Sequence, residues 1–252
     1  MVFNRVTYPL LCRLFDELQV PCEKTDMSFS VQHRPSGLEY AGSSINHLFA
    51  QRKNILSPSF WSLIRNIDRF NQEAVAALAD GSAARKSLLE WTTARGFSED
   101  FRNLYLIPMS GAVWSTPPDQ MLRFPALTLL RFFQNHGFLG LNTQHQWYTV
   151  KDRSRAYVNR LTGSFADRIH LNTPVVKVVR EDRGAWVHLA SGERHHYDRV
   201  LLACHADQAL ALLDQPSTRE ATLLAPFKYQ ANPALLHFDQ SVMPLTRRTW
   251  SS

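Results

Sequence analysis

The chain has 252 residues, of which 44% are hydrophobic and 20% are charged, with a formal net charge of +6. This composition is ordinary for a soluble globular protein of one large domain or two small ones. No apolar run is long enough to span a bilayer, and no internal repeat or low-complexity tract is found.

The basic residues are scattered in pairs such as Arg52-Lys53, Arg85-Lys86 and Arg247-Arg248. This pattern favours dispersed surface charge over a nucleic-acid-binding face, and no nucleic-acid partner is predicted. The alternative is a basic rim that attracts an anionic substrate or a lipid surface. Such a rim would allow peripheral membrane contact. The three cysteines form no CxxC pair and no signal-peptide pattern follows Met1, so we predict a cytoplasmic protein.

In the first half of the chain, helical periodicity dominates. The longest predicted helix spans 59–79, after the Ser57-Pro58 start signal, and its apolar stripe has the spacing of a core-facing helix. The other predicted elements are a strand at 1–4, a helix from Pro9, a hairpin of 28–32 with 38–40, a helix near Ile45 capped by Ser43-Ser44, helices at 87–95, 99–107 and 126–135, and a loop at 108–118.

The second half contains a strand at 147–150, a helix at 154–168 and then a small meander. The meander strands are predicted at 175–180, 185–189 and 194–197, separated by short turns. The apolar run Val200 to Cys204 is typical of a strand buried on both faces. A helix at 207–213 and a strand at 234–238 complete the predicted elements.

Several segments resemble, in their order and spacing, the FAD-dependent amine oxidase superfamily, which includes protoporphyrinogen oxidases and phytoene desaturases. They are Val2-Phe3-Asn4, the loop Tyr105 to Ser115, the helix end Arg131 to Gly137, the strand Trp147 to Lys151 and the meander with its buried strand. The resemblance implies a mixed α/β (α+β) fold in which a partial FAD-binding Rossmann-like domain carries a mostly helical substrate-domain insert. It places the FAD-binding domain at 1–8 and 150–225 and the substrate-binding domain at 9–149 and 226–252.

The same resemblance implies the activity of a flavoprotein oxidoreductase. FAD is the expected cofactor, and hydride transfer from a C–N or C–C bond to the flavin is the expected reaction. The substrate is expected to be a small or lipid-like molecule, and the oligomeric state is left open. A non-catalytic globular remnant or binding domain without cofactor is the alternative function.

Three features depart from the family pattern. No G-x-G-x-x-G occurs, although such a turn holds the FAD pyrophosphate at a helix N-terminus. The Gly-Gly-Ser turn is replaced by Asp152-Arg153-Ser154, and Asn232-Pro233 stands where many amine oxidases carry a lysine. We therefore expect a fragment that lacks both ends, binds FAD poorly by itself and exposes sheet edges.

The resemblance also assigns cofactor contacts. The backbone of Val175 matches the position that holds the adenine, and Ala203 and Cys204 match small residues that pass close to the cofactor. Ordinary strand packing is the alternative for all three. The candidates for a substrate cavity are Trp114, His136, Tyr148 and Lys151, with core packing as the alternative for the aromatic ones. No catalytic residue is assigned.

Other motifs indicate no further chemistry. The histidines His188, His195, His196 and His205 lack a helical i, i+4 pair and a cysteine partner, so no metal site is predicted. Ser110-Gly111 has no assignable base, and no nucleophile-elbow or Walker motif occurs.

Overall fold

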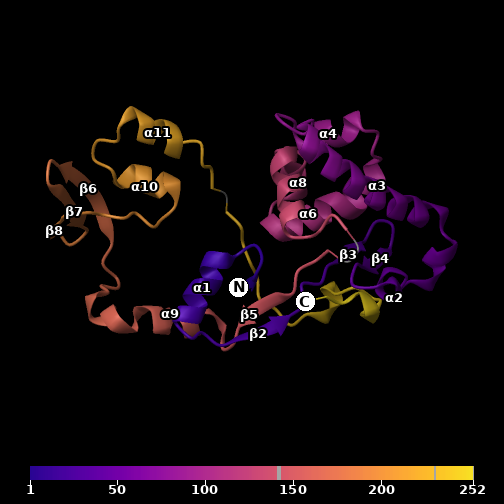
Figure 1. Ribbon diagram of the computed structural model, residues 1–252, viewed down its shortest axis with the longest axis horizontal. Helices are drawn as coiled ribbons and strands as arrows, with labels where there is room; N and C mark the ends of the chain where they lie inside the picture. Colours follow the sequence, from indigo (N-terminus) through magenta and orange to yellow (C-terminus); the bar gives the residue numbers. More distant parts are fainter. Residues whose placement is uncertain (141–142, 230, 252) are drawn as a thin grey trace. The chain divides into compact units, whose positions relative to one another are not determined.

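The computed structural model describes residues 1–140, 143–229 and 231–251 (Figure 1). The chain divides into two compact units, which we call unit 1 (Met1–Leu161 and Leu236–Ser252) and unit 2 (Thr162–Leu235). Both combine helices with short antiparallel sheets, so the predicted mixed fold class is confirmed. The assignment of cofactor and substrate domains to these parts of the chain stays a prediction.

Unit 1 contains most of the secondary structure. Its elements are β1 (Val2–Asn4), α1 (Pro9–Glu17), β2 (Cys22–Thr25), β3 (Ser30–His33), β4 (Leu38–Ala41), α2 (Ile45–Leu48), η1 (Arg52–Leu56), α3 (Pro58–Asp80), α4 (Leu88–Ala94), α5 (Glu99–Phe101), the π-helical turn η2 (Arg102–Leu106), α6 (Ile107–Trp114), α7 (Pro118–Met121), α8 (Ala126–Asn135), β5 (Trp147–Val150), α9 (Arg153–Thr162), η4 (Gln240–Val242) and η5 (Arg247–Thr249).

The first sheet of unit 1 joins strands that are distant in sequence. β5 is its central strand and pairs antiparallel with β1 on one side and β2 on the other. Phe3 and Phe15 meet edge to face beneath this sheet, with ring centroids 5.2 Å apart, and form a small core with Val150. The β3–β4 hairpin forms a separate two-stranded sheet, as its turn signal predicts.

The long helix α3 organises the larger core of unit 1. Ser57 caps it by accepting a hydrogen bond from the Phe60 N–H at 3.3 Å, and Gly81 ends it at a φ of +73°. Phe60, Leu63 and Phe70 are buried along one face, so the predicted helix and its core-facing stripe are confirmed.

The C-terminal segment of unit 1 is held against β4 by a buried carboxylate. Glu39 is 4% exposed, and its two oxygens accept the backbone N–H groups of Leu245 and Thr246 at 2.8 Å each. Gln32 adds a hydrogen bond to Glu39 and another to the Met243 carbonyl. A segment about 200 residues later in the sequence is thus fixed to the hairpin mainly by one side chain.

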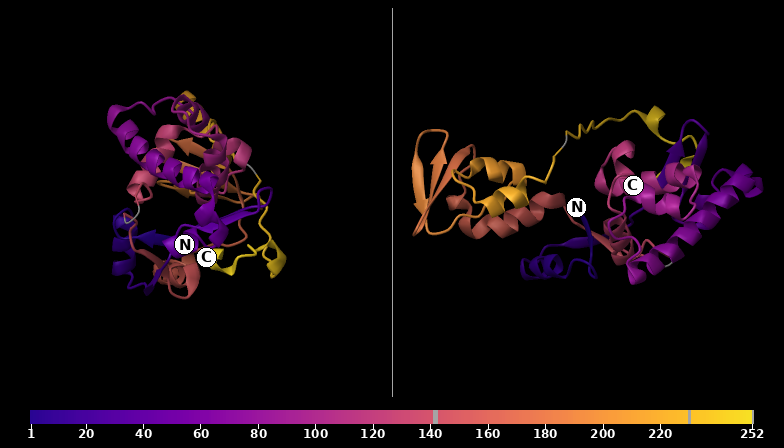
Figure 2. Two further views of the ribbon diagram at one scale, coloured as in Figure 1. Left: turned by 90° about the vertical axis from the view of Figure 1, so that its right-hand side faces the viewer. Right: turned by 90° about the horizontal axis from the view of Figure 1, so that it is seen from above.

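Unit 2 is built around the predicted meander. It comprises η3 (Gly163–Arg168), β6 (Val175–Glu181), β7 (Gly184–Leu189), β8 (Arg194–Tyr197), α10 (Ala206–Leu212) and α11 (Thr218–Leu224). The strands form an antiparallel sheet in the order β6-β7-β8, and α10 lies beside β6 (Figure 2). Gly184 turns the chain between β6 and β7 at a φ of +108°, where an added Cβ would lie 2.5 Å from the Tyr197 carbonyl oxygen.

Three sequence predictions are wrong within the described residues. Residues 200–204 and 234–238 form no strand, since no described strand pairs with them and their backbone gains no sheet hydrogen bonds. The predicted loop at 108–118 begins instead as α6, which continues directly from the π-helical turn η2, since Leu106 and Ile107 keep right-handed helical dihedral angles. The strand β2, the helices α7 and α11, and the short turns η1, η4 and η5 were not predicted.

The turn between β5 and α9 is strained. Asp152 and Arg153 have φ values of 62° and 67°, a region that disfavours side chains other than glycine by about 1–2 kcal/mol per residue. The backbone therefore keeps the conformation of a Gly-Gly turn although both glycines are replaced.

Glycine at either position should stabilise unit 1. We expect Asp152→Gly and Arg153→Gly each to raise the free energy of unfolding by about 0.5–1 kcal/mol, the relief of strain less the entropic cost of glycine. Chemical denaturation measures this change. Arg155→Gly, inside α9 where glycine only weakens the helix, is the matched control and should lower stability by about 1 kcal/mol. Loss of stability in all three variants would contradict the strain at the turn.

Candidate functional site

The substrate-cavity candidate His136 is buried in an aromatic setting. Its Nδ1 lies 2.9 Å from the Phe132 carbonyl oxygen and its Nε2 lies 3.2 Å from the Tyr8 hydroxyl. Because a carbonyl only accepts, Nδ1 donates to Phe132, while Nε2 shares its hydrogen bond with the Tyr8 hydroxyl. The ring stacks on Phe132, with centroids 3.9 Å apart, and lies nearly parallel to Trp147.

Trp114 is brought near His136 by a shared neighbour. Its ring packs against Phe132 with centroids 4.7 Å apart, and against Phe124 at 5.0 Å. The end of α6 and the end of α8 therefore meet through Phe132. Two of the four cavity candidates thus lie around one ring, although they come from helices about 20 residues apart in sequence.

Tyr148 and Lys151 lie elsewhere. Tyr148 stacks on Phe3 at 6.0 Å and carries the Arg5 guanidinium over its ring at 5.6 Å, so it belongs to the small core under the β1-β5-β2 sheet. Lys151 is exposed, and its backbone N–H donates to the Pro21 carbonyl. The structure does not bring these two side chains to His136, and the common cavity stays a prediction.

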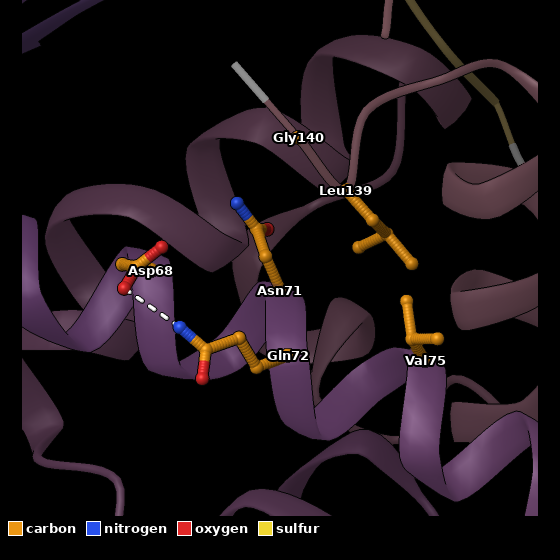
Figure 3. A pocket seen from close by; sticks show the side chains of 6 residues that line it. All are labelled: Asp68, Asn71, Gln72, Val75, Leu139 and Gly140. Carbon is orange, nitrogen blue, oxygen red and sulfur yellow. Dashed lines mark hydrogen bonds between the residues drawn. The ribbon is translucent and has the colours of Figure 1, made fainter.

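A depression of about 330 Å³ lies on another part of unit 1, along one side of α3 (Figure 3). Its lining residues are Asp68, Asn71, Gln72, Val75, Leu139 and Gly140, and it includes none of the four cavity candidates. Gln72 donates to the Asp68 carboxylate at 2.8 Å, while Val75 and Leu139 point toward one another. With its carboxylate engaged by an amide, the depression offers no acid–base pair.

The cofactor candidates lie at the start of β6 and in the solvent-exposed segment 200–204 of unit 2. Val175 is the first residue of β6 and pairs with Leu189, while Val176 beside it stands at an irregularity of the strand and is half-exposed. Ala203 and Cys204 are exposed in the extended segment 200–204, where Leu201 is 91% exposed. The segment predicted as a buried strand is therefore open to solvent on this chain.

Comparison with known families decides the relationship. A model of the family described as flavin containing amine oxidoreductase matches residues 1–242. The chain belongs to this family. The resemblance found in the sequence is thereby confirmed, and the family is one of flavin-containing oxidoreductases.

Solved structures show the same fold at low identity. Wild-type putrescine oxidase bound to putrescine matches with a TM-score of 0.59 and 17% identity, over 88% of this chain and 51% of its own. Cyclohexylamine oxidase from Brevibacterium oxydans (TM-score 0.60, 14% identity, 89% and 51% covered) and a CLA-producing fatty acid isomerase from P. acnes (0.57, 14%, 89% and 51%) are similar. The chain thus spans about half the length of these structures. No curated protein sequence matches it.

The residues predicted to contact FAD can be compared with what this chain presents to solvent. The start of β6 and the segment 200–204 present backbone groups that no described strand occupies, and Ala203 leaves room for close approach. The sequence contains no G-x-G-x-x-G turn for the pyrophosphate. The contacts predicted for Val175, Ala203 and Cys204 concern the adenosine end of the cofactor and stay a prediction.

Sequence reasoning missed two charged groups, each of which joins distant segments within a single unit. Glu39 carries no motif, and its role shows only in the fold. Glu220 accepts two hydrogen bonds from Arg180, at 2.7 and 3.0 Å, and closes a capping box with Ser217. Arg180, and then the backbone and hydroxyl of Ser217, lower the pKa of Glu220 to about 2. The signal that could have revealed α11 is the capping-box pattern of Ser217 followed three residues later by Glu220.

Proposed function

We propose that the chain forms part of a FAD-dependent oxidoreductase that removes a hydride from a C–N or C–C bond of a small or lipid-like substrate. The family match over residues 1–242 carries the proposal. When bound, the flavin accepts the hydride and passes the electrons to dioxygen or another acceptor. The protein supplies the binding surface, the orientation of the substrate and a shielded cavity.

Unit 2 is proposed to contribute to the cofactor domain, predicted at 1–8 and 150–225. Among its described residues only Val178, Ala185 and Ala209 are buried apolar side chains. Such a small core leaves Leu201 and Val176 in water, which is unfavourable for side chains of this size. Both observations support a larger sheet that covers residues 200–204 in the complete protein, with the backbone of Val175 and the small side chains of Ala203 and Cys204 facing the cofactor.

The helical part of unit 1 is proposed to form the substrate domain, predicted at 9–149 and 226–252. Its aromatic core is closely packed, as a scaffold for a substrate cavity should be. His136, hydrogen-bonded to the Phe132 carbonyl and the Tyr8 hydroxyl, contributes shape and a fixed orientation there. Trp114 extends the same aromatic wall.

The substrate class has two branches. The printed names of the structural neighbours include oxidases of putrescine and cyclohexylamine and an isomerase of a fatty acid, so the fold accommodates both amines and lipids. Asn232-Pro233 replaces the lysine that the amine oxidase resemblance leads us to expect. Because this departure weakens the case for amine oxidation, the proposal includes oxidation of a C–C bond as well as of a C–N bond.

Anaerobic reduction of the bound flavin tests the proposed reaction. A longer polypeptide that contains this chain and retains FAD is mixed, without dioxygen, with a panel of amines and of unsaturated fatty acids. We expect at least one class to bleach the visible flavin band, and air to restore it. A band that both classes leave unchanged, while dithionite bleaches it, would argue for the non-catalytic alternative.

A further inference from the structure

One face of unit 1 combines exposed apolar side chains with basic ones. Residues 40–67 contain no Asp or Glu, and they include Arg52, Lys53 and Arg65. Leu56, at the end of η1, is 87% exposed, and Ile45 at the start of α2 is 78% exposed. A soluble surface rarely combines large exposed aliphatic side chains with positive charge alone over such a stretch.

A tryptophan is fixed within this stretch. The indole N–H of Trp61, in the first turn of α3, donates to the Ile55 carbonyl at 2.8 Å. Its ring packs on Phe49, with centroids 5.2 Å apart, and stays partly exposed. Because its polar group is satisfied by the backbone, the exposed part of the ring is apolar. Arg65 follows four residues later, on the same side of α3.

The C-terminal segment repeats the same combination. Residues 240–252 contain no Asp or Glu but include Arg247 and Arg248, both of which are exposed. Leu245 is 92% exposed, and the indole N–H of Trp250 donates to the Pro244 carbonyl at 2.8 Å, which fixes a second half-exposed indole ring.

The fold places the two segments side by side. η5 contacts α2 and β4, and in Figure 1 the yellow C-terminal segment lies beside α2. Glu39 is buried beneath the segment, where its carboxylate accepts two backbone N–H groups, and the exposed Asp68 and Asp239 lie just beyond the two stretches. The resulting surface, which we call the basic apolar face, is made of α2, η1, the start of α3 and η5.

We infer that the basic apolar face binds the surface of an anionic lipid bilayer. Fixed indole rings and aliphatic side chains flanked by Lys and Arg are the composition of interfacial membrane contacts, in which apolar groups enter the headgroup region and cations pair with lipid phosphates. Within the described parts of the chain no helix is long and apolar enough to cross a bilayer, so the contact is peripheral. The excess of positive charge within both stretches favours an anionic membrane over a neutral one.

Vesicle flotation tests this inference with the full 252-residue chain. We expect the chain to float with vesicles of phosphatidylcholine and phosphatidylglycerol, to stay behind with phosphatidylcholine alone, and to bind less at high salt. Each basic side chain near such a surface strengthens binding about fivefold, so Lys53→Glu with Arg248→Glu should weaken binding more than tenfold. Leu56→Ser with Leu245→Ser should weaken it by about tenfold.

Matched variants outside the face separate its role from general charge and hydrophobicity. Lys86→Glu and Leu10→Ser change exposed residues of the same types and should leave flotation unchanged. The inference is overturned if the wild-type chain binds neither vesicle or both equally, or if the control variants weaken binding as much as the face variants. It is also overturned if the face variants break up a dimer in sedimentation and leave flotation unchanged, since the face would then join two copies.

Discussion

Replacing Phe70 with alanine should lower the free energy of unfolding of unit 1 by about 3–5 kcal/mol. Phe70 is fully buried at the middle of α3, and its ring contacts five other aromatic rings, those of Trp91, Phe97, Phe101, Tyr105 and Phe133. The substitution removes the apolar transfer energy of the ring and leaves a cavity that neighbours on four separate elements cannot all fill. A loss of this size is a large fraction of the 5–15 kcal/mol that stabilises a typical domain.

Chemical denaturation followed by tryptophan fluorescence measures this loss, because Trp91 packs directly on Phe70. Phe227→Ala is the matched control, since Phe227 is 59% exposed in unit 2 and its removal should change stability by less than about 0.5 kcal/mol. Equal effects of the two substitutions would mean that the aromatic core around α3 does not stabilise unit 1 as described.

Replacing Glu39 with alanine should release the C-terminal segment from β4 at a cost of about 2–4 kcal/mol. The estimate counts the loss of charge-assisted hydrogen bonds to the N–H groups of Leu245 and Thr246, each of which is worth about 1.5–3 kcal/mol before the freed segment gains solvation. Faster amide exchange at Leu245 and Thr246, and faster tryptic cleavage after Arg247, are the expected observations. Glu23→Gln, which changes an exposed carboxylate on β2, should alter neither.

The attachment should also depend on pH. Burial raises the pKa of Glu39, but hydrogen bonds from Thr246, Leu245 and Gln32 outweigh it and set the pKa below its ordinary value. Since the folded pKa is the lower one, the stabilisation is complete above the ordinary carboxylate pKa and is lost as pH falls through the folded value. Amide protection of Thr246 in the wild-type chain should therefore fall with acid, whereas Glu39→Ala should be unprotected throughout. Protection that survives in the variant would show that Glu39 is not the attachment point.

Local signals were sufficient to predict the elements that stabilise themselves. The proline at the start of α3, its apolar period and Gly81 at its end define that helix without reference to the rest of the chain. The meander of unit 2 follows from its short turns in the same way. These elements supported a family resemblance because their order and spacing, and not any single motif, matched.

The wrong predictions concern segments whose structure depends on partners. Val200 to Cys204 and Ala234 to Phe238 have the composition of strands, but a strand forms only where a neighbour accepts its hydrogen bonds. Phe238 is 96% exposed for this reason. The attachment by Glu39 could not be predicted either, because the contact joins residues about 200 positions apart and uses backbone groups that carry no sequence signal.

Residues of the candidate site could be predicted from the sequence, but their arrangement in the fold could not. Sequence placed His136 and Trp114 in one group, and the fold brings both to Phe132, yet it puts Tyr148 in a different core and leaves Lys151 in solvent. The difference arises because successive residues of a strand face opposite sides, so that Trp147, and not Tyr148, lies against His136.

The visible absorption spectrum after incubation with FAD and desalting tests the central claim most directly. Two polypeptides are compared: the 252-residue chain, and a longer one in which a strand, a G-x-G-x-x-G turn and a helix precede residue 1. We predict that the chain alone is colourless, because the proposed adenine contacts without a phosphate site leave most of the cofactor unheld, and that the longer polypeptide retains stoichiometric flavin. A colourless longer polypeptide, or a chain that keeps the flavin bands by itself, would contradict this account.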